Sequence, residues 1–101
     1  MKHYILENKK HKEVDLMTWA RWFEKNSNRR VALTKGKKGW FVSTVFLGID
    51  HSLGLGKELL YETMVFDSGT DLDQNPFRYS TYKQAEAGHK KVVSQLKKKL
   101  V

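Results

Sequence analysis

Apolar residues recur with helical spacing in two segments of the chain. The first segment is 16–25, where the apolar positions are Leu16, Trp19, Ala20 and Phe23. Spacing of i, i+3, i+4 and i+7 places side chains on one face of a helix. Asp15, directly before this segment, is a residue type favoured at a helix N-cap. We therefore predict a helix over 16–25 that buries this face.

The second helical pattern follows Thr81 and continues towards the end of the chain. Thr81 and Gln84 have the spacing of a capping box, in which two side chains satisfy the first free backbone N–H groups of a helix. The apolar stripe comprises Ala85, Gly88 or His89, Val92, Leu96 and Leu100. Because glycine lowers helix propensity, we expect Gly88 to allow a close approach between helix and sheet.

Between these helices the chain is rich in β-branched and aromatic residues, which favour strands. The strongest strand pattern, 40–50, is apolar on both faces towards its centre and predicts a central strand. Further strands are predicted at 30–34 and 58–66, with a short extended piece at 77–79, an acidic loop at 67–76 and a possible N-terminal hairpin within 4–14. The prediction is a single α+β domain over 1–101. It has an antiparallel meander of three main strands, with one helix before it and one after.

Composition narrows the chemistry of this domain. The chain of 101 residues has no cysteine, which excludes disulfides, thiolate metal sites and thiol catalysis. Its apolar runs are too short for a signal peptide or a membrane span, so we expect a cytoplasmic protein with no membrane partner. No motif in the sequence indicates a metal or another cofactor.

The net charge of +8 comes from 19 basic and 11 acidic residues. Such a charge attracts nucleic acids, although a lysine-rich surface can also serve solubility alone. Most of the basic residues are clustered, at Lys9, Lys10 and Lys12, at Arg29 and Arg30, at Lys35, Lys37 and Lys38, at Lys90 and Lys91, and at Lys97, Lys98 and Lys99.

Several segments together form a recognisable pattern. They are 43–51 (STVFLGIDH), 61–66 (YETMVF), 78–81 (RYST), 86–89 (EAGH), 19–24 (WARWFE) and 29–32 (RRVA). This set resembles a family of small uncharacterised proteins encoded by bacteriophages and prophages. The resemblance implies expression in a bacterial cytoplasm and admits a role such as antagonising a host defence system.

Three residues are candidates for catalysis, namely His51, Glu62 and His89. If the last helix packs across the sheet, His89 could approach Glu62, and a carboxylate beside an imidazole can serve as an acid–base pair or as metal ligands. Alternatively, the pair could fix the helix to the sheet without chemistry, or Glu62 could face outward, since an unpaired buried charge is costly.

The candidate binding residues are Trp22, Trp40, Lys37, Lys38, Asp50 and His51. Exposed aromatic rings beside lysines can stack on bases, and they can also be hot spots for protein binding. For each tryptophan, however, a place in the core or as cover for the sheet is the favoured interpretation.

These observations leave three functions open. A non-enzymatic protein-binding module fits the small size and predicts an exposed apolar or aromatic patch, or an open strand edge that could also support a homodimer. A nucleic-acid-binding protein predicts lysines that converge on one face. A small metal-dependent or acid–base enzyme requires His51, Glu62 and His89 to meet in a cleft.

Overall fold

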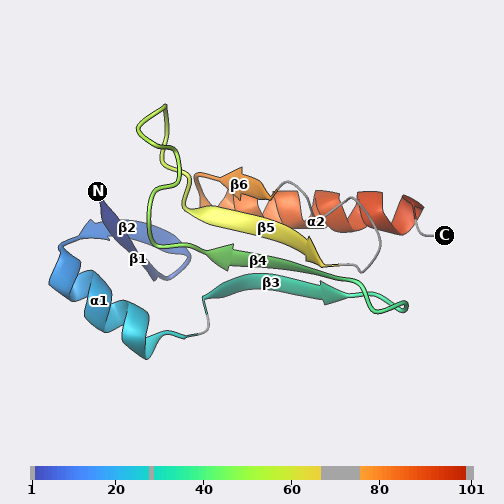
Figure 1. Ribbon diagram of the computed structural model, residues 1–101, viewed down its shortest axis with the longest axis horizontal. Helices are drawn as coiled ribbons and strands as arrows, with labels where there is room; N and C mark the ends of the chain where they lie inside the picture. The colour runs from blue at the N-terminus through green and yellow to red at the C-terminus, as the bar shows by residue number, and fades with distance from the viewer. Residues whose placement is uncertain (1, 28, 67–75, 100–101) are drawn as a thin grey trace.

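The computed structural model describes residues 2–27, 29–66 and 76–99 and shows two helices and two antiparallel sheets (Figure 1). The elements in chain order are β1 (His3–Glu7), β2 (Lys10–Val14), α1 (Leu16–Lys25), β3 (Arg30–Lys35), β4 (Phe41–Phe46), β5 (Tyr61–Phe66), β6 (Phe77–Tyr79) and α2 (Tyr82–Lys99). The predicted α+β class is confirmed, including the N-terminal hairpin. Most of the predicted acidic loop, and Leu100, lie outside the described residues.

The larger sheet has the strand order β3-β4-β5-β6, and every neighbouring pair is antiparallel. Helix α2 runs along one face of this sheet (Figure 1). Alternate residues of β4 show the sidedness, because Val42, Thr44 and Phe46 are buried while the residues between them are partly exposed. The sheet therefore has a face covered by α2 and a second face opposite it.

Strand β4 is shorter than its sequence pattern predicts, because the backbone turns at Gly48. Gly48 has φ +79°, a left-handed conformation that glycine adopts without steric cost. Its carbonyl accepts a hydrogen bond from the Tyr4 N–H at 2.9 Å, and His3 forms an isolated bridge with Ile49. The turn thus attaches the β1–β2 hairpin to the end of the larger sheet.

The core beneath α2 consists of two apolar clusters. The first contains Tyr4, Phe46, Leu60, Tyr61 and Ala85, and the second contains Trp40, Val42, Val65, Val92 and Leu96. The Thr–His layer, comprising Thr34, Thr44, Thr63 and His89, also lies between α2 and the sheet, and its members except Thr34 are buried. Since Thr44 follows Val42 and precedes Phe46 on the covered face, this polar layer separates the two clusters.

Helix α1 forms where predicted, but it is rotated relative to the predicted face. Leu16 is 57% exposed, whereas Trp22 packs edge-on against Phe46 with ring centroids 5.7 Å apart. Trp19 and Phe23 are half-buried beside it, with their rings 4.7 Å apart. The prediction that Leu16 and Ala20 belong to the buried face is wrong, because the helix contacts the rest of the molecule through its aromatic side.

Helix α2 begins at the predicted capping residues. The Thr81 hydroxyl accepts a hydrogen bond from the Gln84 N–H at 3.1 Å, and the Gln84 side chain accepts one from the Ser80 N–H at 3.1 Å. A side chain at Gly88 would overlap the ring of Tyr79, so the expected close approach to the sheet occurs at β6. None of the helices in the described ranges is long and apolar enough to cross a membrane.

Candidate functional site

The face of the larger sheet opposite α2 carries a patch of partly exposed apolar side chains. Register places Leu33, Ser43 and Met64 side by side across three strands, and it places Lys35, Phe41 and Phe66 in the adjacent row. Direct antiparallel partners project from the same face of a sheet. We define the uncovered face by its apolar members Leu33, Phe41, Val45, Met64 and Phe66.

Two aromatic rings lie at one end of the uncovered face. Phe41 and Phe66 are stacked with centroids 4.6 Å apart and planes inclined by 16°. Phe66 remains 40% exposed although it belongs to a strand of the sheet. Lys35, the cross-strand neighbour of Phe41, places a cation beside this aromatic pair.

At the opposite end of the uncovered face, Glu62 forms an ion pair with Arg78. The distance between the Arg78 Nε and the Glu62 carboxylate oxygen is 3.0 Å, and the two residues are cross-strand partners. Glu62 therefore faces away from α2. The hypothesis that His89 approaches Glu62 is wrong, and the alternative that Glu62 faces outward is confirmed, because the two side chains lie on opposite faces of the sheet.

His89 instead belongs to the Thr–His layer, where both ring nitrogens have hydroxyl partners. Nδ1 lies 2.7 Å from the Thr44 hydroxyl, and Nε2 lies 2.9 Å from that of Thr34. The imidazole is only 4% exposed, and this burial lowers its pKa below the ordinary value of 6.5. A neutral imidazole with both nitrogens engaged is suited to joining α2 to β3 and β4.

Asp50 and His51 have separate structural surroundings. Burial alone would raise the pKa of the Asp50 carboxyl, but hydrogen bonds from the Leu59 and Ser52 N–H groups and from the Ser52 hydroxyl lower it overall. Asp50 therefore fixes the loop between β4 and β5. His51 is exposed, and its backbone N–H donates to the Leu59 carbonyl at 3.0 Å. Among the described residues, no group of His, Asp and Glu has the arrangement of a metal site.

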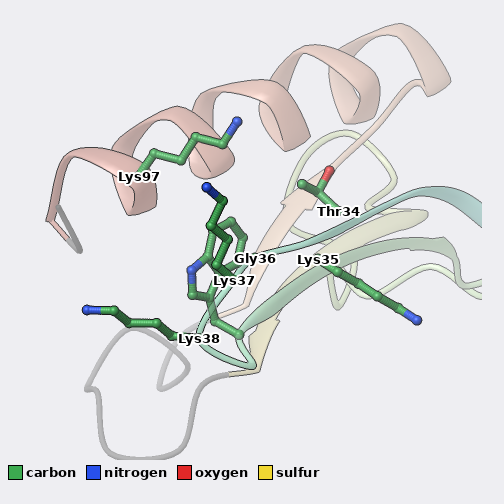
Figure 2. A pocket seen from close by; sticks show the side chains of 7 residues that line it. Thr34, Lys35, Gly36, Lys37, Lys38 and Lys97 are labelled. Carbon is green, nitrogen blue, oxygen red and sulfur yellow. The ribbon is translucent and has the colours of Figure 1, made fainter.

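Trp40, Lys37 and Lys38 line a cavity of about 460 Å³ between the β3–β4 loop and the end of α2 (Figure 2). The lysines are exposed, but Trp40 is only 6% exposed. The hypothesis of an exposed stacking platform at Trp40 is wrong, because the indole belongs to the second apolar cluster. Trp22 is half-buried against Phe46 and is likewise part of the packing.

Sequence reasoning missed the residues of the uncovered face. The sequence YETMVF of β5 does not alternate between apolar and polar residues, and the alternation becomes visible only in the structure, where Tyr61, Thr63 and Val65 are buried and the intervening Glu62 and Met64 are partly exposed. That alternation indicates a strand with one covered and one uncovered side.

No family model, no curated protein and no solved structure matches the chain.

Proposed function

We propose that this protein is a non-enzymatic protein-binding module and that it docks through the uncovered face. The observation that carries the proposal is the stacked pair of Phe41 and Phe66 on a sheet face opposite the packed helix. The partner we infer is a different protein with an apolar surface bordered by carboxylates.

The composition of the uncovered face fits the energetics of protein interfaces. A few residues at the centre of an interface supply most of the binding free energy, and large aromatic side chains are frequent among them. Phe41 and Phe66 already hold each other in place. Docking would therefore cost little additional side-chain conformational entropy. Leu33 and Met64 extend the apolar surface beside them.

Charge favours a different protein over a second copy of this chain. Each copy carries a net charge of +8, so two copies brought face to face would repel each other. Lys35 at the aromatic end would instead attract a carboxylate on the partner. The resemblance to small phage and prophage proteins suggests a bacterial host protein as the source of that partner.

The distribution of the candidate catalytic residues also supports a binding role. Glu62 lies on the uncovered face, His89 is enclosed beneath α2, and His51 belongs to the exposed loop after β4. An acid–base mechanism needs its groups within hydrogen-bond reach of one substrate. This arrangement gives each of them a different environment.

The test is site-specific photocross-linking in bacterial cells, with the cross-linking residue placed at Ser43 in the middle of the uncovered face. The captured protein is then purified and titrated with the wild-type chain and with Phe66→Ser. We expect Phe66→Ser to weaken binding by about tenfold or more, as for an aromatic hot spot.

The matched control is Leu53→Ser with Leu55→Ser, two strongly exposed apolar side chains in the loop between β4 and β5. This double variant should leave the affinity unchanged. Equal losses in both variants would show that general surface hydrophobicity causes the binding. A cross-link from Ser43 to a second copy of the chain, with a dimer by ultracentrifugation, would replace the proposed partner with a homodimer.

A further inference from the structure

A basic groove lies between β3 and α2, on the side of β3 that is opposite the uncovered face. Two adjoining cavities, of about 460 Å³ and 280 Å³, share Thr34 and Lys97 in their walls and together form the groove. Five lysines line it, namely Lys35 at the end of β3, Lys37 and Lys38 from the β3–β4 loop, and Lys90 and Lys97 from α2. Figure 2 shows Lys37 directed towards α2, whereas Lys35 points away from the groove.

The charge of the groove is uniform along its described walls. No carboxylate lines either cavity within the described part of the chain. On α2, Lys83, Lys90 and Lys97 recur every seven residues, so they form a row with a spacing of about 10.5 Å along the helix axis. The only acidic residue of α2, Glu86, lies one turn before Lys90 and outside both cavities.

The floor of the groove is apolar and rigid. Trp40 packs against Gly36, whose N–H donates to the Trp40 carbonyl at 2.8 Å, and a side chain at Gly36 would overlap the indole. Trp40 also packs in the cluster that holds Val92 and Leu96 of α2. The indole thereby holds the lysine-bearing loop against the lysine-bearing end of the helix.

We propose that the basic groove binds the sugar–phosphate backbone of single-stranded nucleic acid. Lysine ammonium groups around the rim would neutralise phosphates, while the apolar stems of the same lysines would contact the sugars. A groove of this volume has room for only a few nucleotide units of a flexible strand. Protein docking at the uncovered face does not depend on this site.

The affinity for a single strand should fall as the salt concentration rises, with a slope set by the number of phosphates neutralised. Each phosphate neutralised on a single strand contributes about −0.7 to the slope of log K against log salt concentration. Leaving aside Lys35, whose side chain points away, the other four lysines give a slope of up to about −3 if each meets one phosphate. Removing three of them should reduce that slope by about 2.

The experiment measures fluorescence anisotropy of a labelled 20-nucleotide oligothymidylate between 50 and 200 mM NaCl. The test variant is Lys37→Gln/Lys38→Gln/Lys97→Gln, which removes charge only from exposed side chains. The control variant is Lys12→Gln/Lys25→Gln/Lys57→Gln, which removes the same charge from exposed positions on other elements. Circular dichroism establishes that both variants remain folded.

We expect the groove variant to lose at least tenfold in affinity at 50 mM NaCl, with the smaller salt slope, while the control stays within about twofold of the wild type. Equal losses in the two variants would show attraction to the overall charge and would overturn the proposal. So would equal affinity for an oligoglutamate peptide, tighter binding of the matching duplex, or no measurable binding at 50 mM NaCl.

Discussion

At the scale of single residues, His89 is an ionisable side chain that is enclosed beneath α2, away from water. It is held neutral by burial between threonine hydroxyls on β3 and β4. In the unfolded chain, the same imidazole is exposed to water and takes up a proton near its ordinary pKa of 6.5. Folding therefore excludes a proton that the unfolded state accepts.

This linkage predicts a loss of stability in mild acid. Because the pKa of His89 is lowered in the folded state, its contribution to stability is present above about pH 6.5 and is lost as the pH falls towards the folded-state pKa. One proton gives a slope of at most about 1.4 kcal/mol per pH unit. Urea unfolding at a series of pH values between 5 and 8 measures it.

The variant His89→Gln separates this effect from other titrations. It should be less stable than the wild type at pH 8 by about 1–3 kcal/mol, because glutamine cannot satisfy both threonines with the same geometry. Its free energy of unfolding should nevertheless change less between pH 6.5 and 5. The control His51→Gln, at an exposed position, should retain the wild-type slope. If the free energy of unfolding of His89→Gln depended on pH as strongly as that of the wild type, another group would be responsible for the pH dependence.

At the scale of elements, the packing of α2 on β6 depends on a glycine. Gly88 lies against the ring of Tyr79, which itself packs on the first apolar cluster. Replacing glycine by alanine within a helix ordinarily stabilises it by about 1 kcal/mol. Here the added methyl group would displace the tyrosine ring, so the sign should be reversed.

We therefore expect Gly88→Ala to lower the free energy of unfolding by about 1–2 kcal/mol, an overpacking effect. Thermal or urea denaturation followed by circular dichroism measures it. In the background Tyr79→Ser, where the ring is absent, the same substitution should become stabilising. A stabilising effect of Gly88→Ala in the wild-type background would mean that Tyr79 moves aside without cost.

The sequence predicted the positions of the helices and strands better than it predicted which of their side chains are buried. Helix 16–25, the helix after Thr81 and the strands of the meander follow from spacing, capping residues and β-branched content, which are local properties. The side of the sheet to which Glu62 points depends instead on strand register, and a shift of one residue exchanges the two faces. That is why the pairing of Glu62 with Arg78, and not with His89, was not predicted.

The basic groove shows the same limit for tertiary structure. Lys37 and Lys97 are 60 residues apart in the chain and come together because Trp40 packs with α2 residues. The clusters of lysines were evident from the sequence, but their convergence required the fold. The rotation of α1 was likewise decided by the contact of Trp22 with Phe46, which local spacing does not encode.

At the scale of the whole molecule, the two apolar clusters and the polar layer between them lie under one helix. Since α2 contributes Ala85 to the first cluster, His89 to the layer and Leu96 to the second cluster, loss of either cluster should loosen the other. We therefore expect the domain to unfold in one cooperative step.

The variant Leu96→Ala tests this coupling. It removes a side chain that is 2% exposed, so it should lower the free energy of unfolding by about 3 kcal/mol. Tryptophan fluorescence, which reports on both ends of the molecule, and far-ultraviolet circular dichroism should shift together to the same lower midpoint. Two separate transitions would show that the clusters unfold independently.

Strand β3 borders both proposed binding surfaces, and it does so by the simple alternation of its side chains. Thr34 projects towards the basic groove, while its neighbours Leu33 and Lys35 project to the opposite side. The irregularity in pairing between Arg30 and Ala32 precedes this segment. An insertion that moved the strand by one position would exchange the residues that face α2 with those that face away from it. Such a change would damage recognition of both ligands at once, although every lysine and phenylalanine would remain in the chain.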